Sequence, residues 1–201
     1  MKEFLKSAPI SVICGWKRGF DFLFALLLLF VLALPMLIVA LLVKLSSKGP
    51  ILYWSDRVGV NNRIFKMPKF RTMQINTPAV ATHLMDNPDK YLTPVGDCLR
   101  KFSLDELPQL YSVLKGDISF VGPRPALYNQ DDLIDLRTVK GVYKLIPGIT
   151  GWAQVNGRDE LPIPVKVEFD EYYLKNKSFW FDLKILILTV VKVIRKDGVS
   201  H

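Results

Sequence analysis

Apolar positions are distributed unevenly along the chain, and the longest apolar run lies near the N-terminus. Residues 22–43 contain no charged side chain, and a helix of about 20 apolar residues spans the hydrocarbon core of a bilayer. The run therefore predicts a membrane-associated helix. A cleaved signal peptide fits poorly, because its apolar core is usually only ~7–15 residues long and a small-x-small cleavage site should follow it.

Two features bear on how this run meets the membrane. Pro35 divides it into arms of 13 and 8 residues, and a proline inside a helix removes a backbone hydrogen bond. Basic residues flank both ends, Lys17 and Arg18 before and Lys44 and Lys48 after, and positive flanks mark the cytoplasmic side. A re-entrant helical hairpin broken at Pro35 and a proline-kinked transmembrane helix fit these residues about equally.

After residue 49 the composition becomes mixed, which predicts a membrane segment over 1–48 and a separate body over 49–201. Residues 51–54 and 63–70 surround a turn-prone stretch and predict a β-hairpin. Ser103 and Glu106 form a capping-box pattern before leucines at helical spacing, which predicts a helix beginning at Ser103 and ending at Gly116. Residues 169–174 and 179–194 predict two more helices, the second lying on the protein or on the membrane surface.

Composition narrows the classes of partner. Half of the residues are hydrophobic and the net charge is +8, which favours an anionic partner such as nucleic acid, an anionic lipid surface or a phosphorylated substrate. Cys14 and Cys98 are isolated in the sequence, which indicates a reduced, cytosol-facing compartment. The chain has no Walker lysine motif, GxGxxG, zinc-ligand spacing or GxSxG, and this removes several common enzyme classes.

Two neighbouring motifs carry candidate chemistry. Asp105 and Glu106 are adjacent acidic residues, and the helix dipole explains many such pairs at helix starts. Arg124, however, stands between Pro123 and Pro125, so its guanidinium is presented from a stiff frame that suits a phosphate. A rigid turn with a solvent-facing arginine is the plainer alternative.

Two further stretches could bind anions. A cationic cluster interleaved with aromatic residues suits nucleic acid, a nucleotide-sugar or an anionic membrane, or is simply a solvated strand face. Residues 147–158, with glycines, amides, an indole and Arg158, predict a loop with backbone donors and a flat surface for a base. The cationic cluster consists of Arg57, Arg63, Lys66, Lys69 and Arg71.

Several of these stretches form an ordered set of motifs: KFRTM at 69–73, SLDEL at 103–107, KGD at 115–117, FVGPRP at 120–125 and PGITGWAQVNGR at 147–158. With the basic and hydrophobic N-terminus, the set resembles the small monotopic phosphoglycosyl transferases of the bacterial sugar transferase family over nearly the whole chain. The resemblance implies a mostly helical α+β fold, with a re-entrant membrane helix and a cytosolic catalytic domain that contains a small sheet.

The resemblance also implies a reaction. Asp105 matches the family's nucleophile, which attacks the β-phosphorus of a UDP-sugar, releases UMP and passes the phospho-sugar to a polyprenyl (undecaprenyl) phosphate. Mg²⁺ is the family's metal, expected on Asp105 together with substrate phosphates. Glu106 completes the acidic pair, and Arg124 matches a phosphate-binding arginine.

Further site residues and the location follow from the same resemblance. The remaining candidates for substrate binding are Lys69, Arg100, Arg158 and Asp170. The expected place is the cytoplasmic face of a bacterial inner membrane, in contact with membrane lipids and without nucleic acid.

Two alternatives remain at this stage. One is a membrane-tethered basic module that binds nucleic acid or anionic lipid through the cationic cluster, which gives Asp105 and Glu106 no role. The other is a one-step transferase in which Asp105 is only a metal ligand.

Overall fold

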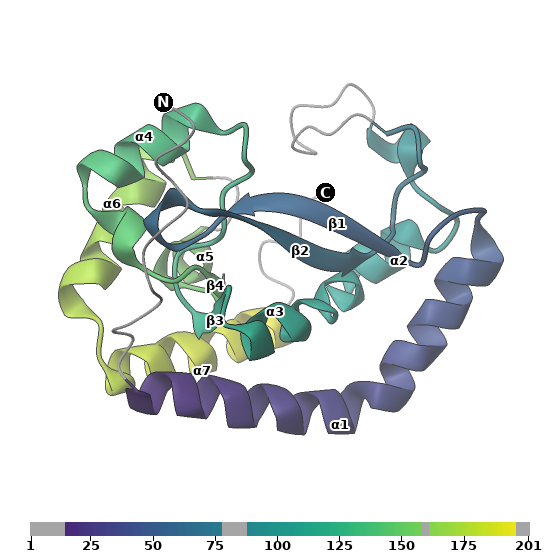
Figure 1. Ribbon diagram of the computed structural model, residues 1–201, viewed down its shortest axis with the longest axis horizontal. Helices are drawn as coiled ribbons and strands as arrows, with labels where there is room; N and C mark the ends of the chain where they lie inside the picture. The colour runs from purple at the N-terminus through teal and green to yellow at the C-terminus, as the bar shows by residue number, and fades with distance from the viewer. Residues whose placement is uncertain (1–14, 78–87, 158–160, 196–201) are drawn as a thin grey trace.

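The computed structural model describes residues 15–77, 88–157 and 161–195. Most of its elements are helices, and the strands form two separate two-stranded sheets (Figure 1). In chain order they are α1 Gly15–Ser46, β1 Leu52–Val58, the 3-10 helix η1 Val60–Asn62, β2 Ile64–Phe70, η3 Pro88–Tyr91, α2 Gly96–Lys101, η4 Leu104–Glu106, α3 Gln109–Lys115, β3 Ser119–Val121, α4 Asp131–Val139, η5 Val142–Lys144, β4 Gly148–Thr150, α5 Trp152–Asn156, α6 Ile163–Asn176 and α7 Phe179–Arg195.

The predicted membrane segment corresponds to α1, a single helix of 32 residues with Pro35 inside it. The helix is not interrupted at the proline, but its axis changes direction within its length (Figure 1). Among the described residues, α1 is the one helix long and apolar enough to cross a membrane. The mostly helical α+β class predicted from the sequence is confirmed, with one long apolar helix and small sheets.

One face of α1 packs against the rest of the protein. Ala25 belongs to the larger hydrophobic core, and Val39 and Val43 belong to a second, smaller one. The other face is open, with Phe30 83% and Leu34 66% exposed. Apolar surface of this extent on a protein marks a contact with membrane or partner.

Charged side chains attach the beginning of α1 to the body. Lys17 forms an ion pair with Asp182 of α7 and donates to the carbonyl of Val121 at 3.0 Å. Arg18 donates to two backbone carbonyls at the C-terminal end of α3. The sequence predicts that both cations are flanking charges that orient the helix, and the structure gives both of them partners within the protein.

The predicted β-hairpin is confirmed. β1 and β2 pair antiparallel from Leu52 opposite Phe70 to Val58 opposite Ile64, so the first strand extends beyond the predicted 51–54. The connection η1 contains Asn61 at φ 54°, a left-handed conformation that asparagine tolerates better than most residues.

Residues 147–157, the described part of the predicted loop, do not form a loop throughout. They begin with β4, which pairs parallel with β3, and continue into α5. The backbones approach so closely that a Cβ atom on Gly148 would lie 2.1 Å from the nitrogen of Gly122. Gly148 therefore allows the close packing of β3 and β4.

The helix predicted to begin at Ser103 begins later. Ser103 has a left-handed φ of 54° and makes no side-chain cap; a short 3-10 turn follows, and α3 starts at Gln109 after Pro108. The capping-box prediction is therefore wrong, because the Glu106 carboxylate binds side chains from other elements. The predicted end at Gly116 is confirmed, with φ 91° at the helix terminus.

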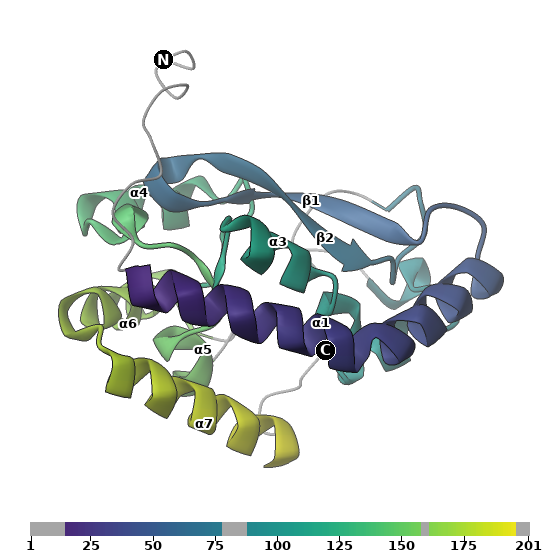
Figure 2. The same ribbon diagram turned by 60° about the horizontal axis from the view of Figure 1, so that its bottom comes forward.

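Helices α6 and α7 confirm the two C-terminal predictions. Residues 169–174 lie inside the longer α6, and α7 covers the predicted 179–194. Ile185 of α7 is fully buried, whereas Trp180 is 74% and Ile187 56% exposed. Figure 2 shows α1 and α7 on the side of the molecule away from the β1–β2 hairpin.

Candidate active site

Asp105 and Glu106 lie in the 3-10 turn η4, between α2 and α3. The left-handed turn at Ser103 places them against β2, and Asp105 is only 7% exposed. A buried carboxylate beside a second carboxylate is costly unless cations or hydrogen bonds compensate. The surrounding side chains supply that compensation unequally.

Glu106 receives most of the positive charge. Lys69 of β2 donates to its Oε1 at 2.7 Å, and Nη2 of Arg124 lies 3.4 Å from the same oxygen. Burial alone would raise the pKa of Glu106, but the charges of Lys69, Arg124 and Arg57 and the hydrogen bond from Lys69 hold it far below its usual range. Glu106 is therefore an anion at neutral pH that orients two cations.

Asp105 has the opposite environment. Burial raises the pKa of Asp105 and the neighbouring Glu106 charge adds to the rise, although Lys69 and Arg100 oppose it. Arg100 is held in place by Thr72, whose Oγ1 lies 3.0 Å from its Nε. Within the described part of the chain, the Asp105 carboxylate accepts a hydrogen bond from its own backbone N–H, and no other residue's side chain forms a hydrogen bond or ion pair with it.

Asp170 is linked to Arg124 through Arg137. It is 1% exposed and binds Arg137 of α4, with Nη2 of Arg137 2.7 Å from Oδ2. Arg137 also donates from Nη1 to the backbone carbonyl of Arg124 at 2.8 Å. Sequence reasoning missed Arg137 because a single arginine in a mixed helical stretch carries no motif; its partner lies 33 residues further along the chain.

The five cations of residues 57–71 do not act as one surface. Arg71 is 5% exposed and donates to the carbonyls of Ser47 and Lys48 at the end of α1. Lys69 forms an ion pair with Glu106, and Arg57 donates to the carbonyl of Pro125 at 3.2 Å. These contacts remove cations from the patch that the nucleic-acid alternative requires. The predicted site residue Arg158 lies outside the described residues.

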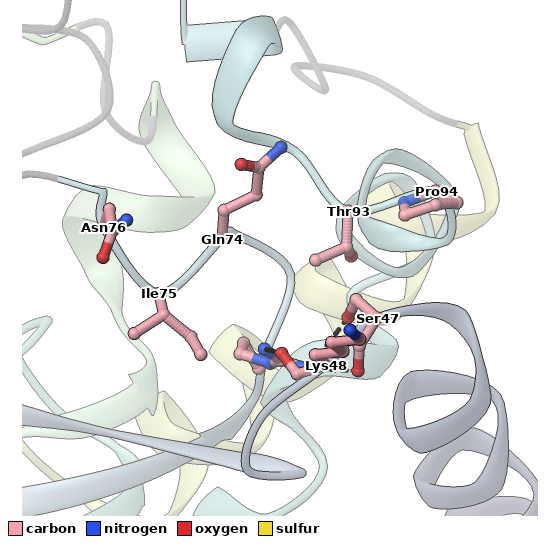
Figure 3. A pocket seen from close by; sticks show the side chains of 8 residues that line it. Ser47, Lys48, Gln74, Ile75, Asn76, Thr93 and Pro94 are labelled. Carbon is pink, nitrogen blue, oxygen red and sulfur yellow. Dashed lines mark hydrogen bonds between the residues drawn. The ribbon is translucent and has the colours of Figure 1, made fainter.

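A cavity of about 290 Å³ lies elsewhere, at the end of α1 (Figure 3). Its lining includes Arg71, whose guanidinium is already bound to Ser47 and Lys48. Neither Asp105 nor Glu106 lines it.

Of the two carboxylates, Asp105 is the one that fits a Mg²⁺ site. The described residues contain no group of three or more His, Cys, Asp or Glu side chains that could hold a metal alone. Mg²⁺ in phosphoryl-transfer sites commonly uses only one or two protein carboxylates and takes its other ligands from substrate phosphates and water. Asp105 fits that donor set, whereas Glu106 is occupied by cations.

Comparison with known proteins identifies the family. The model of the bacterial sugar transferase family matches residues 13–196. The chain is 42% identical over 187 residues to the uncharacterized sugar transferase EpsL of Bacillus subtilis (strain 168), covering 92% of this chain and 90% of that protein. The chain belongs to the bacterial sugar transferase family, which confirms the prediction made from the motifs.

Two longer relatives have more specific names. The UDP-N-acetylgalactosamine-undecaprenyl-phosphate N-acetylgalactosaminephosphotransferase of Aeromonas hydrophila is 39% identical over 195 residues, which are 94% of this chain and 46% of that protein. The UDP-glucose:undecaprenyl-phosphate glucose-1-phosphate transferase of Escherichia coli (strain K12) is 42% identical over 186 residues, 88% of this chain and 39% of that protein. The chain thus spans less than half of these two relatives.

Proposed function

We propose that the protein is a phosphoglycosyl transferase that moves a sugar-1-phosphate from a UDP-sugar to a polyprenyl phosphate. The observation that carries this proposal is the buried Asp105, which forms no ion pair with the residues that the structure describes, beside a Glu106 that fixes Lys69 and Arg124. The names of the longer relatives, which specify UDP-sugars and undecaprenyl phosphate, support the same donor and acceptor classes.

In the first step, an oxygen of the Asp105 carboxylate attacks the β-phosphorus of the UDP-sugar. The new bond joins this oxygen to phosphorus, the bond from phosphorus to the bridging diphosphate oxygen breaks, and UMP leaves with that oxygen and its electron pair. The raised pKa of Asp105 goes with a more basic and more nucleophilic carboxylate.

In the second step, an oxygen of the polyprenyl phosphate attacks the same phosphorus. The acyl-phosphate bond to Asp105 breaks, the carboxylate is regenerated, and the product is a polyprenyl diphosphate sugar. Both steps conserve charge without a required proton transfer, so a histidine base is unnecessary.

Charge crowding is the main physical obstacle to this reaction. Two like charges ~4 Å apart near a protein surface repel by about 4 kcal/mol, roughly a thousandfold in rate. Lys69, Arg100 and Arg124 are the described cations that can offset the approach of a diphosphate to Asp105. Mg²⁺ held by Asp105 and the substrate phosphates would neutralise further charge on the diphosphate.

The attachment of α1 supports a monotopic arrangement, with both ends of the helix on the cytoplasmic side of the inner membrane. A straight 32-residue helix is about 48 Å long, enough to cross a ~30 Å core, so length does not decide the matter. Arg18 attaches one end to α3, and Arg71 attaches the other end to β2. A single body bound to both ends favours a re-entrant helix bent at Pro35.

Release of UMP tests this proposal. Purified protein is mixed with Mg²⁺, a polyprenyl phosphate and each of several UDP-sugars. The expected result is UMP release with at least one sugar, its loss in Asp105→Asn and its retention in Asp97→Asn, an exposed aspartate on α2. If the folded wild-type protein releases no UMP with any sugar, the proposal fails for those donors, and salt-dependent polyanion binding becomes the next measurement.

Omitting the acceptor separates the covalent route from the one-step alternative. The covalent route predicts up to one equivalent of UMP per protein molecule in the absence of polyprenyl phosphate. A one-step transferase, with Asp105 only as a metal ligand, releases none until the acceptor is added.

A further inference from the structure

The loop that carries Arg124 is held through its carbonyl oxygens. Pro123 and Pro125 have no N–H group to contribute to a strand ladder. Instead, the Pro123 carbonyl accepts from the nitrogen of Gly148 at 2.9 Å, the Arg124 carbonyl from Arg137 at 2.8 Å, and the Pro125 carbonyl from Arg57 at 3.2 Å. Three consecutive carbonyls are therefore bound by three separate elements.

Arg137 is the buried one of the two arginines that donate to these carbonyls. Its side chain is 10% exposed, and it directs Nε and Nη2 to Oδ2 of Asp170 at 3.0 and 2.7 Å. This pairing fixes the plane of the guanidinium and leaves Nη1 for the Arg124 carbonyl. Asp170 also neutralises the charge of Arg137, so that Arg137 does not compete with Arg124 for Glu106 or for a phosphate.

We propose that Arg137 and Asp170 are positioning residues that hold the backbone of Arg124 so that its guanidinium meets Glu106 and a substrate phosphate. This inference rests on the proposed function, and it gives Asp170 a role behind the site rather than in direct contact with the substrate. A displacement of the Arg124 carbonyl moves the guanidinium, and misplacement by about 1 Å can cost on the order of a hundredfold in rate.

A double-mutant cycle on kcat/KM tests the proposal. Arg137→Lys keeps the charge, but a lysine lacks the planar guanidinium that donates hydrogen bonds to Asp170 and to the Arg124 carbonyl at the same time. We expect Arg137→Lys and Asp170→Asn each to lower kcat/KM by about 10- to 100-fold in the wild-type background. In an Arg124→Ala background, which lacks the guanidinium, either change should cost less than about threefold.

The control is the neighbouring ion pair between the same two helices. Lys140 lies 3.0 Å from Glu171, and Glu171→Gln breaks this contact without touching the Arg124 loop. We expect Glu171→Gln to leave kcat/KM unchanged in both backgrounds. Melting temperatures of all variants show whether each is folded at the assay temperature.

The outcomes are distinguishable. Absence of UMP release by the wild-type protein contradicts the proposed function, whereas wild-type activity with equal losses in both Arg124 backgrounds overturns only the positioning role. If Arg137→Lys and Asp170→Asn are both unfolded at the assay temperature, the pair is a folding element and the proposal is likewise wrong. Losses that require Arg124 support it.

Discussion

Asp105 and Glu106 are adjacent in the chain but have opposite electrostatic environments. Glu106 binds Lys69 and Arg124 and has a depressed pKa, whereas Asp105 is buried, forms no ion pair with another described residue and has a raised pKa. Neighbouring carboxylates with divided properties commonly have separate roles. The division is consistent with the proposed roles, nucleophilic attack by Asp105 and cation placement by Glu106.

This division predicts a shift in the pH dependence of activity. Asp105 must be ionised to attack, so kcat/KM falls as the pH drops through its raised pKa. The Glu106 charge contributes to that raised pKa. Glu106→Gln should therefore move the acid limb of the kcat/KM pH profile to lower pH, and it should also lower the maximum kcat/KM. Glu106→Asp keeps the charge and should keep the limb near its original position. An acid limb that moves to higher pH in Glu106→Gln contradicts this account.

The same environment predicts a stability effect. A carboxylate whose folded-state pKa is raised above its unfolded value destabilises the fold once the pH rises through the folded pKa. Asp105→Asn should therefore melt at a higher temperature than wild type at neutral pH, and the difference should disappear on acidification. Thermal unfolding of wild type, Asp105→Asn and the exposed control Asp97→Asn measures this. A lower melting temperature for Asp105→Asn at neutral pH would contradict the assignment.

At the scale of elements, α1 is attached to the catalytic body by specific polar contacts as well as by apolar packing. Arg18 binds two carbonyls at the C-terminal end of α3, the helix that follows Asp105 and Glu106. A guanidinium there also interacts favourably with the helix dipole. The contact links the membrane helix to the turn that holds the carboxylates.

Arg18→Lys tests this attachment, because a lysine keeps the charge but cannot bind both carbonyls as a fork. We expect the free energy of unfolding to fall by about 1–3 kcal/mol. Lys44→Gln, an exposed change at the other end of α1, should alter it by less than about 0.5 kcal/mol. Equal effects of the two substitutions in detergent-solubilised protein would show that Arg18 is not a specific attachment point.

Elements with a local signal were predictable from the sequence, and those set by distant partners were not. The apolar runs over residues 22–43 and 179–194 depend on nearby residues, and both form helices, as predicted. The start at Ser103 was misplaced because Glu106 binds Lys69, 37 positions earlier, instead of a neighbouring backbone N–H. The strand at Gly148 depends on a close approach to Gly122, which glycine-rich composition alone cannot distinguish from a loop.

At the scale of the whole molecule, the proposed arrangement puts both ends of α1 on one side of the membrane. Gly15→Cys and Lys48→Cys place thiols at exposed positions beside the two ends, in a background where Cys14 and Cys98 are serine. A membrane-impermeant thiol reagent should label both in inverted vesicles and neither in intact spheroplasts. Lys66→Cys, on the exposed part of β2, reports the side of the body. Labelling of the two ends from opposite sides would establish a crossing helix.

The most direct measurement of the central claim is the mass of the peptide that contains Asp105. The protein is first incubated with an active UDP-sugar in the absence of acceptor, and the reaction is then quenched. The account predicts an added mass of one phospho-sugar on Asp105, lost when polyprenyl phosphate is supplied and absent in Asp105→Asn. Full transfer activity with an unmodified Asp105, or an adduct on another residue, would contradict it.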